Sequence, residues 1–271
     1  MPVRPAMTSG TDGPMTDLLG ADGRAADPAA QSDIDDRLAM LYAWPDDQLA
    51  DGPVVRANMV VSLDGGIGVD GRSGGLGNDA DGRLFQVLRD LADVILVGSG
   101  TVRAEGYGGV EADPERMARR VRWGLPGTPP PIAVVTNRGV AADLPLFTDT
   151  VTPPIVITPK AAAGQAPDGA DVIIAGEDEV DLPAAVAALG RRGLRRVHCE
   201  GGPRILGELV AAGRLDELCL TLAPTMVGPG NGSLLGGVEL PQQADWVPTG
   251  PEGGVAVADG AVFLRYRRRG R

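Results

Sequence analysis

Short apolar runs alternate with amphipathic segments along most of the chain. The runs rich in Val, Ile and Leu have the length and the flanking turn residues of β-strands. They span 54–63, 94–97, 132–135, 155–158, 172–174, 196–199, 218–223, 255–258 and 261–267. Three segments are predicted as helices, at 83–92, 182–192 and 203–212. In the first of them, four apolar residues recur at the i, i+3, i+4, i+7 spacing of one buried face: Leu84, Val87, Leu88 and Leu91.

The order of these elements predicts the fold class. Strands that alternate with helices form a mostly parallel sheet, with helices packed on its faces. The last two strands flank Asp259 and Gly260, a dipeptide typical of a tight hairpin turn. We therefore expect a three-layer α/β fold whose central sheet is mostly parallel and whose C-terminal edge is antiparallel.

The N-terminal segment differs in composition from the rest. Residues 1–37 are rich in Ala, Gly, Asp and Pro and hold few large apolar side chains, so we expect a poorly ordered tail there. Residues 38–271 are expected to form a single domain. The aromatic stretch at 38–45 is predicted to form a short helix that docks on this domain.

Charge and composition narrow the choice of partners. The formal net charge of -11 disfavours binding to nucleic acid and to anionic membranes. The apolar runs are too short to span a bilayer, and the N-terminus does not resemble a signal peptide, so we expect a cytoplasmic protein. One histidine, His198, and two separated cysteines cannot assemble a structural zinc site or a disulfide framework. We therefore expect no bound metal.

The strongest chemical signal is the sequence Glu200-Gly201-Gly202-Pro203. A predicted strand leads into two glycines and then into a helix, an arrangement that lets the pyrophosphate of a nucleotide approach the backbone. The alternative is a tight turn that needs glycine for conformational reasons alone. A second glycine turn, Gly98-Ser99-Gly100-Thr101, also ends a strand. Two such turns on parallel strands favour a nucleotide at the carboxyl edge of the sheet.

Several motifs in order give the chain a specific resemblance. These are the segments 62–65, 98–102, 200–203 and 214–218, followed by 223–224 and 227–228. Together they resemble the reductase family of riboflavin biosynthesis. The resemblance implies a dihydrofolate-reductase-like fold, NADPH as cofactor and a homodimer. It further implies reduction of a phosphorylated aminopyrimidine, as 5-amino-6-(5-phosphoribosylamino)uracil reductase does.

The resemblance also implies roles for individual residues. Thr101 and Glu105 match the segment that holds the nicotinamide end of NADPH, and six residues match the pyrophosphate-binding turn and helix start: Gly201, Gly202, Pro203, Arg204, Ile205 and Leu206. Thr136, Asn137 and Arg138 follow a central strand and supply the hydroxyl and the cation that a 2′-phosphate requires. The expected substrate-binding residues are Ser73, Leu76, Arg89, Tyr107 and Glu200. Each of these residues also has a purely structural interpretation, such as a helix cap or a surface charge.

Two carboxylic acids are candidates for catalysis, Glu200 and Asp81. In folate reductases a carboxylate near the start of the corresponding helix pairs with the pterin amino group, and Asp81 has this position. The other interpretation is that Asp81 only complements the helix dipole. No pattern supports a covalent nucleophile, so we expect direct hydride transfer.

The segments that flank the substrate depart from the family pattern. Residues 74–77 and 106–109 are rich in glycine where the riboflavin enzymes carry bulkier, acidic or proline residues. The chain also lacks the Pro-Cys-x-x-Cys motif of a zinc deaminase. Three alternatives stay open: a pterin or dihydrofolate reductase-like enzyme, a nucleotide-binding protein without activity, and a structural subunit that uses the sheet edge to dimerise.

Overall fold

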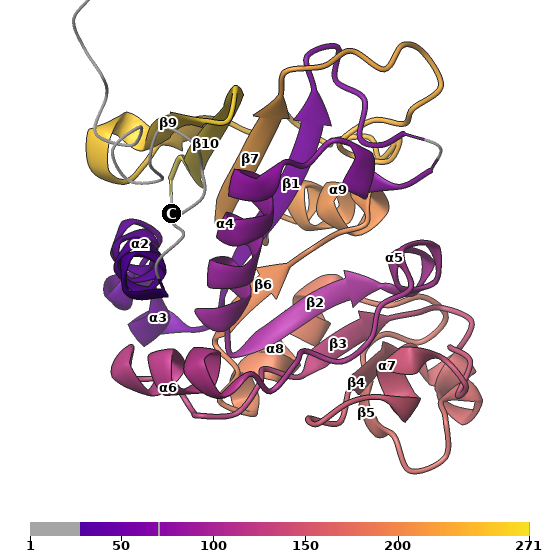
Figure 1. Ribbon diagram of the computed structural model, residues 1–271. Coiled ribbons are helices and arrows are strands. Elements are labelled where there is room, and N and C mark those ends of the chain that lie inside the picture. The colour runs from indigo at the N-terminus through magenta and orange to yellow at the C-terminus, as the bar shows by residue number, and fades with distance from the viewer. Residues whose placement is uncertain (1–27, 70, 271) are drawn as a thin grey trace, which may run out of the picture.

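The computed structural model describes residues 28–69 and 71–270, and its strands form one sheet (Figure 1). In chain order the strands are β1 (Val54–Ser62), β2 (Val94–Gly98), β3 (Ile132–Val135), β4 (Ile155–Thr158), β5 (Asp171–Ile174), β6 (Arg196–Cys199), β7 (Glu217–Ala223), β8 (Trp246–Pro248), β9 (Val255–Ala258) and β10 (Ala261–Arg268). Across the sheet they lie in the order β5-β4-β3-β2-β6-β1-β7-β10-β8, and β9 also pairs with β10.

The strand directions confirm the expected fold class. Every pairing from β5 to β7 is parallel. At the other edge, β10 is antiparallel to β7, β8 and β9. The hairpin between β9 and β10 turns through Asp259 and Gly260, both at positive φ, as the sequence predicts. The sheet is therefore mostly parallel, with the antiparallel C-terminal edge of the expected dihydrofolate-reductase-like arrangement.

Helices cover both faces of the sheet. They are α2 (Pro28–Leu41), α3 (Asp46–Asp51), α4 (Asp79–Asp90), α5 (Ser99–Glu105), α6 (Pro114–Arg122), α7 (Pro145–Thr148), α8 (Leu182–Arg191) and α9 (Pro203–Ala211), with short 3-10 turns at Ser73–Gly75, Lys160–Gln165 and Pro251–Gly254. The buried residues of α8 and α9 pack on one face, and those of α2, α4, α5 and α7 pack on the other. These three layers bury the central strands from both sides.

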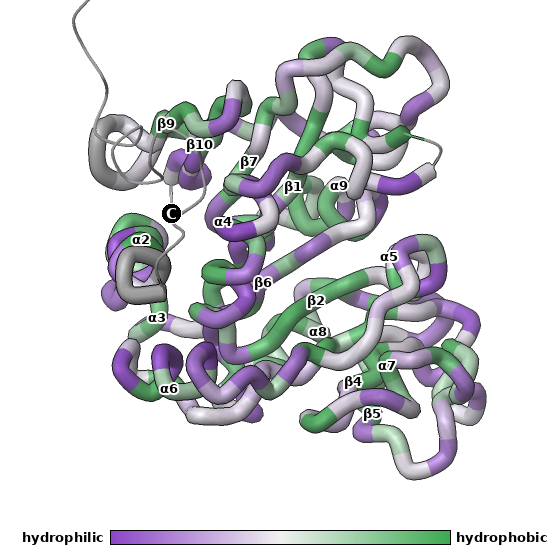
Figure 2. The backbone as a smooth tube through the Cα atoms, in the orientation of Figure 1, coloured by the Kyte–Doolittle hydropathy of each residue, from purple (hydrophilic) through white to green (hydrophobic). Residues whose placement is uncertain are grey.

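Strand β2 shows why the fold follows from the apolar pattern. Its residues are all buried, and they alternate between the two faces of the sheet. Val94 and Leu96 pack under α8 and α9, whereas Ile95 and Val97 pack under α5 and α7. Figure 2 shows hydrophobic residues along this strand. A continuous apolar run of this kind is typical of a parallel strand that is covered on both sides.

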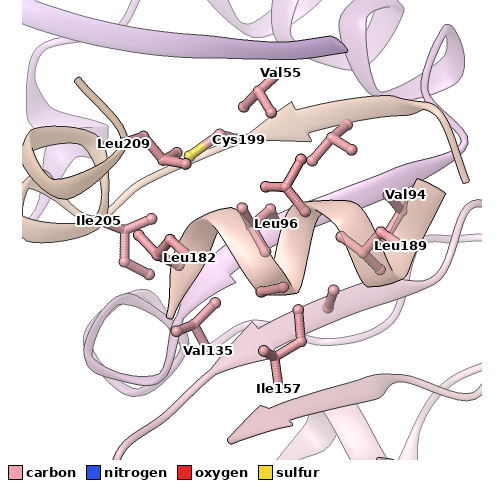
Figure 3. Packing of buried hydrophobic residues seen from close by; sticks show 14 of the residues in the cluster. Val55, Val94, Leu96, Val135, Ile157, Leu182, Leu189, Cys199, Ile205 and Leu209 are labelled. Carbon is pink, nitrogen blue, oxygen red and sulfur yellow. The ribbon is translucent and has the colours of Figure 1, made fainter. Parts of the chain in front are cut away.

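The larger core lies between the sheet and the α8–α9 layer. Figure 3 shows Leu182 and Leu189 of α8 and Ile205 and Leu209 of α9 close to strand residues such as Leu96. All of these side chains are at most 8% exposed. Cys199 belongs to the same cluster as a free, buried thiol. It therefore acts as a small apolar residue, and burial raises its pKa to about 12.

The structure departs from the sequence prediction at several helices, among them α4 and α6. Helix α4 begins at Asp79, four residues before the predicted start, because the Asn78 side chain accepts a hydrogen bond from the Asp81 N–H at 2.8 Å. Helix α6 was not predicted. It carries four arginines, and buried Asp90 binds two of them, Arg116 at 2.6 Å and Arg119 at 3.7 Å. This helix is held by ion pairs rather than by an apolar stripe.

The expected N-terminal boundary is wrong for residues 28–37. They were assigned to a poorly ordered tail, but they form most of α2, which packs against α4. Asp35 of this helix binds Arg83 at 2.8 Å and Arg119 at 3.3 Å. Ion pairs thus order a segment that has few large apolar side chains. The rest of the expected tail, residues 1–27, lies outside the described part of the chain.

A buried carboxylate fastens the chain that follows α2 to the sheet. Glu217 of β7 lies 2.6 Å from a guanidinium nitrogen of Arg56 and 3.0 Å from one of Arg265. Both arginines also donate to carbonyl oxygens of residues 41–43, and Arg56 stacks on the Trp44 ring at 4.1 Å. Burial raises the pKa of Glu217, but the two arginines lower it further, so the net shift is downward.

We predict that Glu217→Gln lowers the free energy of unfolding by about 3 kcal/mol, because it leaves two largely buried guanidinium groups without their shared counter-charge. Denaturant unfolding at pH 7 measures this cost. The matched control is Glu208→Ala, which removes a surface pair with Arg204 and should cost at most about 0.5 kcal/mol. Equal costs for the two variants would contradict this role of Glu217.

Candidate active site

A cavity of about 850 Å³ opens at the carboxyl ends of the central strands. Its walls come from the second half of β1, the start of α4, helix α5 and the turn between β6 and α9. Two glycine-rich loops, at 67–77 and 230–232, complete it. The carboxyl edge of a parallel sheet is where α/β proteins bind ligands. We refer to this cavity as the cleft.

The glycine turn brings backbone directly into the cleft. Gly201 has a φ of +90°, a conformation that favours glycine, and the Gly201–Gly202 peptide bond is cis. The Gly201 carbonyl accepts a hydrogen bond from the Gly98 N–H at 2.8 Å, which joins the two glycine turns found in the sequence. A Cβ on Gly202 would lie only 2.6 Å from the Thr101 hydroxyl oxygen. A side chain at position 202 would therefore displace the Thr101 hydroxyl.

Helix α9 begins at Pro203, directly after this turn, and no side chain caps its N-terminus. Gly202, Pro203 and Thr101 all line the cleft. An uncapped helix start leaves backbone N–H groups and the positive end of the helix dipole available for an anion. The turn and the helix start together fit the pyrophosphate of a dinucleotide.

Glu200 anchors the centre of the cleft. It follows β6, and its two carboxylate oxygens accept hydrogen bonds from Arg89 of α4 at 2.6 and 2.7 Å. The Tyr107 hydroxyl donates to the same carboxylate at 2.7 Å. The Arg89 guanidinium lies between two aromatic rings, at 4.3 Å from Phe85 and 5.4 Å from Tyr107. Three expected substrate-binding residues thus bind one another.

The electrostatics fix the protonation states of this cluster. Burial raises the pKa of Glu200, but the Arg89 charge and its hydrogen bonds lower it further, so the acid is ionised. Burial and the neighbouring Glu200 charge raise the pKa of Tyr107 well above its ordinary value, which keeps the phenol neutral. At neutral pH the cluster holds a carboxylate, a guanidinium and a phenol that donates a proton in its hydrogen bond. Glu200 is therefore not a proton donor at this pH.

His198 lies in β6, two residues before Glu200, and is fully buried. Its Nε2 atom is 3.6 Å from the Glu200 carboxylate, and neither ring nitrogen has a hydrogen-bond partner. Burial lowers the pKa of His198 to about 4, although Glu200 acts in the opposite direction. The imidazole is therefore neutral, and it is buried in the sheet next to Glu200 rather than exposed in the cleft.

Asp81 and Asn58 place polar side chains in the wall of the cleft. Both residues line the cleft, and each has a buried side-chain oxygen without a hydrogen-bond partner. Burial raises the pKa of Asp81, against a smaller lowering by the nearby Thr221 hydroxyl. Of the acids that line the cleft, Asp81 is the one whose carboxyl pKa shifts upward. This acid is therefore the best placed of them to hold a proton.

Ser73 was expected to bind the substrate and Glu105 to hold the nicotinamide end of the cofactor, and the structure pairs the two residues. The Ser73 N–H and hydroxyl both donate to one Glu105 carboxylate oxygen, at 2.9 and 3.1 Å. Both residues line the cleft. Their contact ties the loop at 67–77 to the end of α5, so it shapes the mouth of the cleft.

Several expected site residues do not line the cleft. Leu76 is only 5% exposed, and Ile205 and Leu206 belong to the core beneath α9. They are apolar residues at buried positions, so packing accounts for them. Arg204 points to solvent and pairs with Glu208 at 2.7 Å. The side chains of Arg204, Ile205 and Leu206 therefore take no part in the wall of the cleft.

The turn after β3 lies at the same edge of the sheet but outside the cleft walls. Thr136 is buried and donates its hydroxyl to the Gly139 carbonyl at 2.6 Å. Asn137 uses its side-chain oxygen to accept from the Val180 N–H. Of the three residues expected at the 2′-phosphate, Thr136 and Asn137 therefore use their side chains in hydrogen bonds within the protein. The side chain of Arg138 is exposed.

Sequence reasoning missed Asn58, Phe85 and the loop at 230–232, which all line the cleft. Asn58 carried a signal, because it is a polar residue at the middle of a mostly apolar strand. Phe85 directly follows Leu84, a residue of the buried stripe of α4. The helical spacing of that stripe does not distinguish Phe85 from the exposed residues of the helix. The loop at 230–232 reaches the cleft by tertiary packing, and Asn231 accepts the Ile67 N–H in a backbone bond of 3.0 Å.

Neither a membrane-spanning helix nor a metal-binding cluster occurs among the described residues. None of its helices has the length and apolar character needed to cross a bilayer. No group of three or more His, Cys, Asp or Glu residues within 28–69 and 71–270 is arranged to hold a metal ion. The expectation of a metal-free protein stays a prediction.

A mostly parallel sheet with a glycine turn and a ligand-sized cleft at its carboxyl edge defines an α/β enzyme domain of the nucleotide-binding type. The family model described as the RibD C-terminal domain matches residues 53–251. The chain therefore belongs to the RibD C-terminal domain family, in agreement with the resemblance found in its motifs.

Characterised relatives place this family among reductases. The chain is 28% identical over 180 residues to a protein of Archaeoglobus fulgidus, covering 65% of this chain and 82% of the relative. It is 29% identical over 200 residues to one of Methanothermobacter thermautotrophicus, covering 71% and 88%. Both relatives are named 2,5-diamino-6-ribosylamino-4(3H)-pyrimidinone 5′-phosphate reductase. These names identify the chain as an oxidoreductase.

Solved structures agree with this fold. A pyrimidine reductase-like protein of Corynebacterium diphtheriae superposes with a TM-score of 0.68 at 28% identity, covering 85% of this chain and 98% of that protein. A riboflavin biosynthesis reductase of Saccharomyces cerevisiae shares the fold at 20% identity, with a TM-score of 0.57 and coverage of 80% and 90%.

The single histidine makes one pH dependence attributable. We predict that the protein loses about 2 kcal/mol of unfolding free energy between pH 7 and pH 5 through His198. Its pKa is about 4 in the folded chain against an ordinary value of 6.5, so in this window the unfolded chain binds a proton that the folded chain does not. Stability from this group is complete above pH 6.5 and falls as the pH drops towards 4.

Denaturant unfolding at both pH values tests this prediction. His198→Met keeps an apolar filler and removes the titrating group, so its loss between pH 7 and pH 5 should be smaller by about the same 2 kcal/mol. Comparing the two proteins cancels the contribution of the carboxylates. An identical pH dependence in both would contradict a neutral, buried His198.

Proposed function

We propose that this chain is an NADPH-dependent reductase of a ribosylamino-substituted aminopyrimidine, with the reaction chemistry of 5-amino-6-(5-phosphoribosylamino)uracil reductase. One observation carries the proposal. In a chain of this family, one cleft is lined by Gly202 of the glycine turn, by the Glu200–Arg89 pair and by Asp81. A dinucleotide and a small heterocycle then lie side by side, as hydride transfer requires.

The cofactor end rests on the turn and on Thr101. NADPH supplies the hydride when it is bound, and the chain holds and orients it. The Gly202 backbone and the start of α9 are proposed to bind the pyrophosphate, and Thr101 and Glu105 to lie beside the nicotinamide. We propose Arg138 for the 2′-phosphate, because it is an exposed cation at the same sheet edge.

The substrate end supplies orientation and one proton. Reduction adds a hydride and a proton, and Asp81 is the cleft acid with a raised pKa. The ionised Glu200 holds Arg89 and Tyr107 in place, and these two side chains are proposed to orient the substrate. In this scheme Ser73 borders the substrate only through its contact with Glu105.

A second candidate function is reduction of a pterin. It is favoured by the position of Asp81 in the cleft wall near the start of α4, because a carboxyl there can form a two-point hydrogen bond with a 2-amino-4-oxopyrimidine ring. Pterins and diaminopyrimidinones both contain this ring, so the same residue serves either substrate.

The cofactor site predicts the effect of one glycine. Gly202→Val should weaken NADPH binding at least tenfold, because its side chain occupies the space against Thr101. Calorimetric titration of folded protein measures the change. Gly164→Val is the matched control, since a Cβ at Gly164 meets nothing within 4 Å and the residue lies outside the cleft. Unchanged affinity in a folded Gly202→Val variant would remove the turn from the cofactor site.

The two candidate substrates are separated through Asp81. We expect wild-type protein with NADPH to reduce a ribosylaminopyrimidine, and Asp81→Asn to lower kcat/KM by about 100-fold, since the amide cannot deliver a proton. Dihydrofolate is assayed in parallel. Turnover of dihydrofolate alone, lost in Asp81→Asn, would support the pterin function, whereas full activity of Asp81→Asn on the aminopyrimidine would remove Asp81 from catalysis.

A further inference from the structure

Two loops of the cleft continue from neighbouring parallel strands. Strands β1 and β7 end side by side, with Ser62 opposite Ala223, and Figure 1 shows both running to the same edge of the sheet. We call the segment 63–68, which follows β1, the β1 loop, and the segment 224–232, which follows β7, the β7 loop. Together they contribute to the cleft wall Ile67, Gly68, Gly230, Asn231 and Gly232. The position of one loop relative to the other therefore shapes this wall.

The sequence of the β7 loop gives it little intrinsic order. Gly228, Gly230 and Gly232 have φ angles of +76°, +91° and +74°. Glycine loses more conformational freedom on folding than any other residue, so a segment this rich in glycine needs contacts that hold it in one shape. One such contact is the backbone hydrogen bond from the Ile67 N–H to the Asn231 carbonyl at 3.0 Å. The β7 loop is thus ordered in part by the β1 loop.

Asp64 of the β1 loop joins the two loops through its side chain. Its carboxylate accepts hydrogen bonds from two backbone N–H groups of the β7 loop, those of Val227 at 3.2 Å and Gly228 at 2.7 Å. The Ser62 hydroxyl donates to the same carboxylate at 2.5 Å. These donors, the Ser62 hydroxyl most of all, lower the pKa of Asp64, so the group is ionised at neutral pH. One charged side chain thus connects the end of β1 to the backbone of the β7 loop.

The two loops also pack closely at their glycines. A Cβ on Gly66 would collide with the Val227 side chain, and one on Gly232 would lie 2.9 Å from the Ile67 side chain. The loops therefore have one tightly fitted arrangement, and separating them would open gaps beside the wall of the cleft.

The chain that follows the β7 loop packs on α9. A Cβ on Gly236 would lie 2.6 Å from the Arg204 backbone nitrogen, and one on Gly207 would collide with the Leu235 carbonyl oxygen. Arg204 is the second residue of α9, whose start is proposed to bind the cofactor pyrophosphate. Because the β7 loop continues directly into this segment, its position affects the cofactor end of the cleft.

Asp64 itself is exposed and does not line the cleft. We infer that Asp64 is a positioning residue that holds the β1 and β7 loops together as one wall and thereby sets the affinity of the cleft for NADPH. The inference rests on the proposed function for the identity of the cofactor. The alternative is that Asp64 shapes only its own turn, as aspartates after strands often do. The hydrogen bonds to the backbone of the β7 loop favour the positioning role.

Amide hydrogen exchange of the protein without ligand tests the contact itself. In Asp64→Ala the Val227 and Gly228 N–H groups lose their acceptor, so we expect both to exchange at least tenfold faster, with the amides of β2 unchanged. Asp168→Ala is the matched control, because it removes the same charge from an exposed position outside the cleft. Exchange at the wild-type rate at both amides in Asp64→Ala would overturn the inference.

Calorimetric titration with NADPH tests the consequence for the cleft. We expect Asp64→Ala to weaken binding about tenfold, because the cofactor must then order the loops itself, and Asp168→Ala to leave it unchanged. Asp64→Asn keeps one acceptor oxygen and should restore part of the affinity. In steady-state assays the KM for NADPH should rise more than kcat falls, since Asp64 touches no reacting atom.

The remaining outcomes separate this inference from the proposed function. Equal NADPH affinities of Asp64→Ala and Asp168→Ala, in proteins that bind the cofactor, overturn the inference and leave the reductase function standing. Faster exchange confined to the turn at 65–66 supports the local alternative and overturns the inference as well. If wild-type protein does not bind NADPH, the proposed function fails, and the exchange experiment alone still decides whether Asp64 joins the loops.

Discussion

The ion pair between Glu200 and Arg89 is the constraint on which the cleft depends. A carboxylate at the end of a central strand cannot stay ionised when buried unless a cation and hydrogen-bond donors surround it. Arg89 and Tyr107 supply them from α4 and from the segment after α5. The three contacts fix the distances between these elements and hence the width of the cleft.

This pairing changes the chemistry that can be expected of the site. An arginine in a ligand cleft suggests phosphate binding when it is considered alone. Here its charge is already neutralised inside the protein by Glu200. Asp81 lies in the same cleft without such a cation, and burial raises the pKa of its carboxyl, which supports its proposed role as the proton source.

A second buried carboxylate follows the same rule in a structural role. Glu217 is ionised because Arg56 and Arg265 surround it, and these arginines also bind the carbonyls that follow α2. Glu200 directly follows β6 and Glu217 begins β7, the two strands on either side of β1. One neutralised charge organises the cleft, and the other holds the N-terminal helices on the sheet. The residue type alone does not reveal either role, because both residues are glutamates and differ only in the side chains that surround them.

The sequence by itself determined the layered α/β fold, because continuous apolar runs can only be buried between two helical layers. It also located the glycine turn at 201–202, where close backbone approach and a φ of +90° leave little choice of residue. Tertiary structure alone decided which polar side chains meet. Arg89, Tyr107 and Glu200 are separated by 18 and 93 positions, and Ser73 reaches Glu105 across the mouth of the cleft. Local patterns encode burial and turns, whereas the pairing of charges depends on distances that exist only after the chain has folded.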